Sequence, residues 1–117
     1  MPYSTDDQRI ISKADGIGDN DHSFMLAQHD QGAGYQLRAR IATETPTVDG
    51  HEMKSGPNTL TQNAWSYATL VFDGTNMIIY HNGSFKKSVV HDSPGNILQD
   101  PTKNVSIGNN PVDNRYF

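Results

Sequence analysis

Oxygen-bearing side chains in one glycine-rich loop are the first candidates for chemistry in this sequence. The loop of residues 15–21 supplies the carboxylates of Asp15, Asp19 and Asp21 and the amide of Asn20. Ca²⁺ takes about six to eight oxygen ligands, and acids at alternating positions of a flexible loop can converge on one ion. No glutamate closes the loop as in an EF-hand. The loop predicts a calcium site, with a solvated acidic turn as the alternative.

A second set of polar side chains alternates along one expected strand. Gln36, Arg38 and Arg40 point to one side of it, and planar amide and guanidinium groups recognise hydroxyls and carboxylates. Ile78 and Tyr80 form the outward set of a later strand and would share this exposed surface. We therefore predict a ligand-binding surface of these five residues. Ordinary solvated sheet residues explain the same pattern.

Groups suited to catalysis are not arranged for it. Retaining glycoside hydrolysis needs two carboxylates about 5–5.5 Å apart, but Glu44 and Glu52 are the only glutamates and both fall in or beside an expected loop. The sequence has no cysteine and no G-x-S-x-G elbow. The histidines lack the close spacing of a zinc site and are expected as scattered surface residues: His22, His29, His51, His81 and His91. The chain is not expected to be an enzyme.

Short strands must position these residues. Residues 35–42 alternate apolar and polar side chains, as in a half-buried strand. The pairs Asp73-Gly74 and Asn82-Gly83 are typical of tight hairpin turns. Residues 43–58 contain prolines and glycines without periodicity and are expected to form a long loop. Further strands are expected at 10–11, 23–28, 65–72, 77–81, 85–90 and 104–108. This pattern predicts an all-β, antiparallel fold.

The length and net charge of the chain exclude several classes of protein. A chain of 117 residues suits one domain. The formal net charge is −4 and the basic residues are scattered, so nucleic acid is not expected as a partner. No apolar stretch approaches the roughly 20 residues of a membrane helix, and no signal peptide is visible at the N-terminus.

A family resemblance appears in the second half of the chain. Residues 65–74 read WSYATLVFDG and residues 79–83 read IYHNG, which resembles the core signature of the laminin G-like, concanavalin A-like jelly-roll family. The flanking segments IISK at 10–13 and VSIG at 105–108 resemble two further elements of that family. The resemblance covers residues 10–117 and implies an antiparallel β-sandwich. Trp65, at the start of a strand, is expected to anchor the core, with a sugar platform as the alternative.

The resemblance also sets expectations for organisation and function. The family carries a strand before the IISK element and another after the pair Tyr116-Phe117, so residues 1–117 are expected to be one jelly-roll domain lacking its first and last strands, a fragment of a larger protein. The family implies a non-catalytic binding or adhesion module for a glycan or protein, with Ca²⁺ as a possible cofactor, in an extracellular or cell-surface protein. Uncovered sheet edges favour a homo-oligomer. A structural or assembly domain without a small ligand is the alternative.

Overall fold

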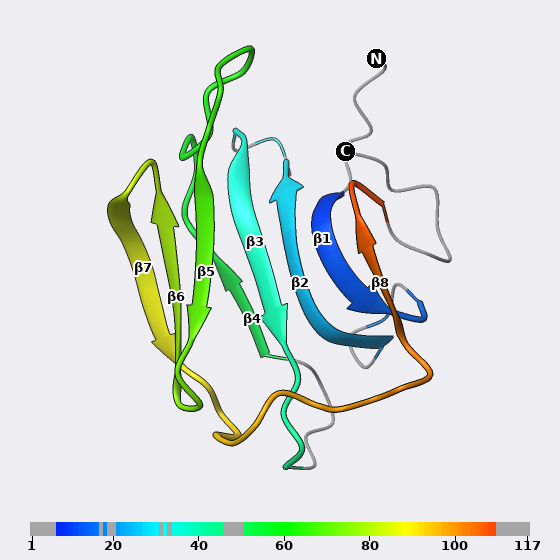
Figure 1. The fold of residues 1–117 in the computed structure, drawn as a ribbon. Coiled ribbons are helices and arrows are strands. Elements are labelled where there is room, and N and C mark those ends of the chain that lie inside the picture. The colour runs from blue at the N-terminus through cyan, green and yellow to red at the C-terminus, as the bar shows by residue number, and fades with distance from the viewer. Residues whose placement is uncertain are drawn as a thin grey trace.

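Two antiparallel β-sheets packed face to face make up the computed structural model (Figure 1). It describes residues 7–16, 18, 21–30, 32, 34–45 and 51–109. The five-stranded sheet has the order β4-β3-β2-β1-β8, and the three-stranded sheet has the order β5-β6-β7. The strands are β1 Gln8–Ala14, β2 His22–His29, β3 Gln36–Ile41, β4 His51–Lys54, β5 Ala68–Phe72, β6 Asn76–His81, β7 Ser84–Val90 and β8 Asn104–Ile107. The predicted all-β, antiparallel sandwich is confirmed.

The core lies between the middle strands of the two sheets. On β3 the alternation predicted from the sequence places Leu37, Ala39 and Ile41 toward the other sheet, where they are buried. Met77 and Ile79 of β6 meet them from the opposite layer. Leu26 of β2 and Met53 of β4 complete the buried cluster. Residues one position away therefore face outward from each sheet.

The two predicted hairpin turns are confirmed. Asn82 and Gly83 have φ values of 50° and 77°, the left-handed pair that a two-residue turn between β6 and β7 requires. Between β5 and β6, Gly74 has a φ of 93° and the Asp73 carboxylate accepts hydrogen bonds from the backbone N–H groups of Thr75 and Asn76 at 2.9 and 2.6 Å. These turns fix the register of the three-stranded sheet.

Two expectations about local structure were wrong. The segment 43–58 is not one loop, because it contains β4, which pairs with the outer edge of β3. The sequence of β4 is mostly polar and Met53 is its one core residue, so it lacks the apolar alternation that would indicate a strand. The strand expected at 65–72 begins only at Ala68.

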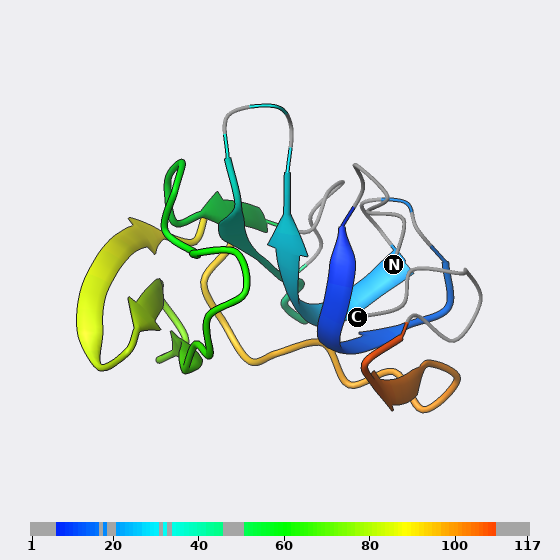
Figure 2. The same ribbon diagram turned by 90° about the horizontal axis from the view of Figure 1, so that it is seen from above.

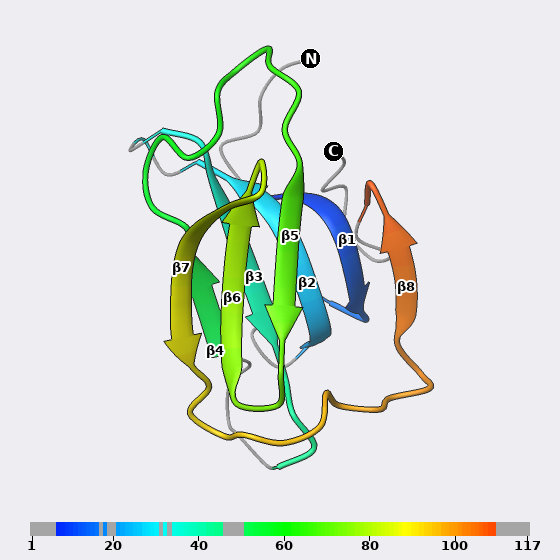
Figure 3. The same cartoon turned by 60° about the vertical axis from the view of Figure 1, so that its left-hand side comes forward.

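The two sheets differ in width. Viewed from above, the strands β5–β7 lie toward the β4 side of the larger sheet (Figure 2). Figure 3 shows β8 at the far side with no strand of the smaller sheet in front of it. Ile107 pairs with Ile11 of β1, and Ile11 in turn pairs with the core residue Leu26 of β2. Directly opposed residues on neighbouring strands point to the same face of a sheet, so Ile107 faces inward. Ile107 is nevertheless 82% exposed and Val105 is 57% exposed. This part of the inner face is not covered by the described chain.

Candidate functional site

A small polar pocket opens where the ends of β1 and β2 meet the segment before β5. Gln8 and Gln28 are direct cross-strand partners, so register brings their two amides to the same end of the sheet. The backbone N–H of Leu60 donates to the carbonyl oxygen of Tyr35 at 3.0 Å and holds the opposite wall in place. The cavity measures about 210 Å³ and its lining residues are Gln8, Gln28, Tyr35, Leu60, Thr61, Gln62, Asn63 and Ala64.

The chemistry of this pocket is that of neutral hydrogen bonding. Each glutamine or asparagine amide offers two N–H donors and an oxygen acceptor, and the Tyr35 hydroxyl can do both. Among the described residues of the lining there is no carboxylate, histidine or cationic side chain. Sequence reasoning did not find this site, because its members come from separate segments. The glutamines at the ends of β1 and β2 are the one signal that a sequence could give.

An apolar cavity of about 260 Å³ adjoins the polar pocket and shares Gln28, Leu60, Thr61 and Ala64 with it. Its remaining wall comes from Ile10, Leu37, Trp65, Ser66 and Ala68. Trp65 lies at its mouth and is fully exposed. The expectation that Trp65 anchors the core was therefore wrong. It precedes β5, and no described residue covers its ring.

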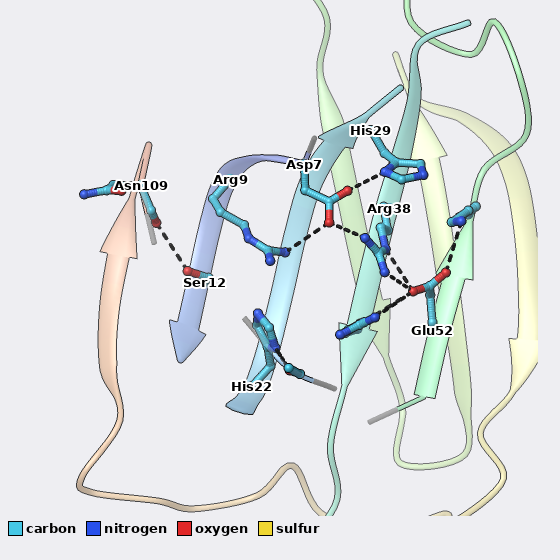
Figure 4. Close-up of polar contacts among 11 residues, drawn as sticks. Asp7, Arg9, Ser12, His22, His29, Arg38, Glu52 and Asn109 are labelled. Carbon is cyan, nitrogen blue, oxygen red and sulfur yellow. Dashed lines mark hydrogen bonds and ion pairs between the residues drawn. The ribbon is translucent and has the colours of Figure 1, made fainter. Parts of the chain in front are cut away.

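Charged side chains form a network on the outer face of the five-stranded sheet (Figure 4). Arg38 donates to the carboxylates of both Asp7 and Glu52, and its Nε–Oε2 distance to Glu52 is 2.9 Å. His29 Nδ1 lies 2.5 Å from Asp7 Oδ1. Arg40 Nη2 lies 3.0 Å from Glu52 Oε2. We call these residues, with Arg9 and Lys54, the charged network.

The charged network holds Glu52 in its ionised form. Burial alone would raise the pKa of Glu52, but the hydrogen bonds from Arg38 and Arg40 outweigh it and lower the pKa to about 2. A carboxylic acid with such a pKa has no proton to give at neutral pH. Glu52 is therefore unsuited to act as a general acid.

The superfamily of the chain follows from a comparison with models of protein families. A family model for the laminin G type, described as the concanavalin A-like lectin/glucanases superfamily, matches residues 1–117. The chain belongs to this superfamily. Laminin G-like domains are commonly binding modules, and the lectin-type fold is typically non-catalytic. Neither a curated protein nor a solved structure was found to match the chain.

The predicted ligand surface is divided between the two outer faces of this lectin-type sandwich. Arg38 and Arg40 lie on the outer face of the five-stranded sheet, while Ile78 and Tyr80 lie on the outer face of the other sheet. The expectation of a shared face was wrong, because the sequence does not say which strands share a sheet. Gln36 and Arg40 are also buried, at 6% and 8% exposure, and the arginines are already paired with Glu52. A ligand role for these residues stays a prediction.

The acidic loop of the lectin-type domain is described in part. Asp15 Oδ1 accepts a hydrogen bond from Lys103 Nζ at 2.6 Å, and Asp21 Oδ2 accepts one from the Gly18 backbone at 2.7 Å. Asp19 and Asn20 lie outside the described residues. Among the residues that are described, no group of three or more acidic or histidine side chains could hold a metal ion. The calcium site stays a prediction.

The histidines are mostly internal, which corrects the expectation of a scattered surface set. His22, His29 and His91 are between 0 and 3% exposed. His91 Nε2 lies 2.8 Å from the Ile41 carbonyl oxygen, and His91 Nδ1 accepts from the Ser93 backbone N–H at 3.0 Å. Burial and the nearby charge of Arg9 lower the pKa of His22 to about 4, so His22 is neutral at pH 7.

In the described part of the chain no helix is long and apolar enough to cross a membrane.

Proposed function

We propose that this domain is a non-catalytic binding module whose polar pocket holds a single sugar residue. The observation that carries the proposal is the lining of the pocket, to which four amide-bearing residues and one tyrosine contribute: Gln8, Gln28, Gln62, Asn63 and Tyr35. Amides match sugar hydroxyls because both groups donate and accept hydrogen bonds. The ring of Tyr35 and the side chain of Leu60 add apolar surface for the C–H face of a sugar.

The dimensions of the pocket decide the size of the ligand. Pockets for drug-sized molecules measure roughly 300–1,000 Å³, whereas this cavity measures about 210 Å³. One sugar ring suits this volume better than an oligosaccharide. Further residues of a glycan would extend outward past the exposed segment 61–64, which forms the rim of the pocket.

A binding role without catalysis is supported by the state of the acidic residues. Asp7 and Glu52 both accept hydrogen bonds from Arg38, and neither lines the polar pocket. The low pKa of Glu52 also disfavours acid catalysis by this residue. The proposal includes calcium assistance by the loop of residues 15–21 and an extracellular setting within a larger protein. A protein ligand is an alternative outcome of the experiment below.

A glycan array probed with and without EDTA tests this proposal first. Any hit is then measured by calorimetric titration of the wild-type domain and of Gln62→Ala. Gln62 is exposed on the rim, so its truncation removes a ligand contact without removing core packing. We expect about tenfold weaker binding, which corresponds to roughly 1.4 kcal/mol. Gln99→Ala is the matched control, because Gln99 is exposed and lies outside the pocket.

Two results would overturn the proposal. One is an array without a glycan signal in either arm, which would favour a protein ligand or a structural role. The other is a hit whose affinity changes equally in Gln62→Ala and Gln99→Ala. Loss of binding in the EDTA arm alone would support calcium assistance, and equal binding in both arms would remove calcium from the proposal.

A further inference from the structure

Exposed apolar side chains gather on the outer face of the three-stranded sheet, which lies in front of the larger sheet in Figure 3. Met77 and Ile79 point into the core, so residues one position away on β6 point outward. The register extends this outward set to the neighbouring strands and gives the outer apolar face: Tyr67, Val71, Ile78, Tyr80, Phe85 and Val90. Four of the seven strongly exposed large apolar residues in the described chain belong to it. Single exposed apolar residues are common, but a contiguous group marks an interaction surface.

The aromatic part of this face is already ordered. Tyr80 and Phe85 are direct cross-strand partners, and their ring centroids lie 6.1 Å apart with the rings nearly perpendicular. Edge-to-face pairs of this kind are favourable and hold the two rings in defined orientations. Phe85 nevertheless remains 60% exposed. A partner that covered it would therefore gain apolar contact area with little ordering of side chains.

The charge of this sheet differs from that of the rest of the chain. Residues 67–90 contain two lysines, Lys86 and Lys87, and one acid, Asp73, so their formal net charge is +1. The whole chain has a net charge of −4, which leaves −5 on the remaining residues. Two copies of the chain repel each other through these acidic surfaces. The three-stranded sheet is where they can approach with the least repulsion.

The four corners of the outer apolar face carry complementary charges. β5 and β7 are the outer strands of the sheet and run in the same direction, because each is antiparallel to β6. Tyr67 and Lys86 therefore lie at one end of the sheet. Asp73 and Val90 lie at the other end. A positive and a negative side chain thus occupy diagonally opposite corners.

We propose that the outer apolar face binds a second copy of this chain in a two-fold symmetric dimer. In such a dimer, each contact between two different residues occurs twice. A two-fold axis that lies in the interface along the diagonal from Tyr67 to Val90 exchanges the other two corners. It brings Lys86 of each copy toward Asp73 of the partner subunit. The strands of the two sheets then cross at a steep angle, as in orthogonal sheet packing.

The size of the face sets the strength of the dimer. Three strands about 4.8 Å apart and about seven residues long cover roughly 15 by 20 Å. Each copy therefore buries only a few hundred Å², whereas standard interfaces bury about 800 Å² per partner. We expect a dimer that forms at high protein concentration and dissociates on dilution.

Sedimentation velocity of the whole 117-residue chain, from about 10 μM to about 1 mM, tests the proposal. We expect a reversible shift from monomer to dimer. Phe85→Ser should weaken association about tenfold or more, because it removes the most exposed ring of the aromatic pair. Ile107→Ser is the matched control, since Ile107 is 82% exposed but belongs to the other sheet, and it should leave association unchanged. If Phe85→Ser does not fold, Val71→Ser on β5 takes its place.

A charge reversal tests the arrangement of the two copies. Lys86→Glu replaces attraction by repulsion at two symmetric positions, so we expect about threefold to tenfold weaker association. Lys87→Glu changes the net charge by the same amount. Lys87 pairs with the core residue Ile79, which places it on the inner side of β7. Its reversal should therefore have a clearly smaller effect.

Four results would overturn the proposal. The first is a monomer at every concentration. The second is equal weakening by Phe85→Ser and Ile107→Ser, which would indicate unspecific apolar association. The third is loss of the dimer in Ile107→Ser alone, which would move the contact to the five-stranded sheet. The fourth is an equal effect of Lys86→Glu and Lys87→Glu, which is incompatible with the proposed axis. The polar pocket shares no residue with the outer apolar face, so these outcomes are independent of the carbohydrate-binding proposal.

Discussion

Arg38 Nε donates to Glu52 Oε2 at 2.9 Å, and the same guanidinium also donates to Asp7. Arg38 lies on β3, Glu52 lies on the edge strand β4, and Asp7 directly precedes β1. The interaction therefore joins three segments across the outer face of the five-stranded sheet. Arg38 is 15% exposed and Asp7 is 2% exposed, so both lie where an unpaired charge would be costly.

Replacement of Glu52 should destabilise the domain in a pH-dependent way. Glu52→Gln leaves the two arginines without their shared carboxylate, and we expect a loss of about 1–3 kcal/mol at pH 7. The pKa of Glu52 is about 2 in the folded state, below its ordinary value of 4.5, so its contribution is present above pH 4.5 and is lost as the pH falls through 2. Urea unfolding at pH 7 and pH 2.5 measures this. Glu44→Gln, at an exposed position, is the control, and an equal effect of both substitutions would contradict the prediction.

His22 should make the domain less stable in mild acid. Its pKa is about 4 when folded against 6.5 ordinarily, because burial and the Arg9 charge disfavour protonation. The unfolded chain therefore binds more protons between these values. Stability is complete above pH 6.5 and falls as the pH drops toward 4, by about 2 kcal/mol between pH 7.5 and 5.

His22→Asn tests this directly. An asparagine amide can replace His22 Nδ1 in its contact with the Gly18 carbonyl oxygen, which is 3.0 Å long, but it does not titrate. The pH dependence of the unfolding free energy between 7.5 and 5 should become shallower in the variant. An unchanged slope would assign the acid sensitivity to other groups.

The core should be sensitive at Met77 and tolerant at its neighbour. Met77 is fully buried among Leu37, Ala39 and Ile79, and truncation of such a residue costs about 2–5 kcal/mol. Ile78 points to the opposite face and is half-buried. Met77→Ala should therefore lower stability by several times the effect of Ile78→Ala in denaturant unfolding. Similar losses for both variants would mean that the sandwich core is assigned to the wrong face of β6.

The turn between β6 and β7 should require glycine. Gly83 has a φ of 77°, a conformation that residues with a Cβ adopt at a cost of about 1–2 kcal/mol. Gly83→Ala should lower the melting temperature, although nothing lies within 4 Å of the added Cβ. Ser84→Ala, at the adjacent exposed position, is the control. If Gly83→Ala is as stable as Ser84→Ala, the turn has another conformation in solution.

The sequence predicted the strands whose side chains alternate and the turns whose residues need positive φ. β3 and the two hairpins of the smaller sheet follow from such local rules, and so does the inward set of Leu37, Ala39 and Ile41. β4 was missed because an edge strand with one core residue has almost no apolar periodicity. Its position depends on pairing with β3 and on the contacts of Glu52, both of which are long-range.

The site was harder to predict for a related reason. Gln8, Tyr35 and Gln62 are separated by more than a strand length in sequence, and the sheet register and the Leu60–Tyr35 hydrogen bond bring them together. For the same reason, the sequence analysis wrongly placed Arg38 and Tyr80 on one shared surface. Alternation shows which residues on one strand share a side, but it does not show which strands belong to one sheet.

The sheet edge at β5 leaves the main-chain groups of Ala68, Leu70 and Phe72 without a strand neighbour among the described residues. Any ligand that paired with this edge would bind the folded chain alone, since the unfolded chain has neither the edge nor the cavities beside it. By mass action such a ligand would add about 2.7 kcal/mol of stability at a free concentration of one hundred times its dissociation constant. The melting temperature would then rise with the ligand concentration, and binding would be part of the folding equilibrium.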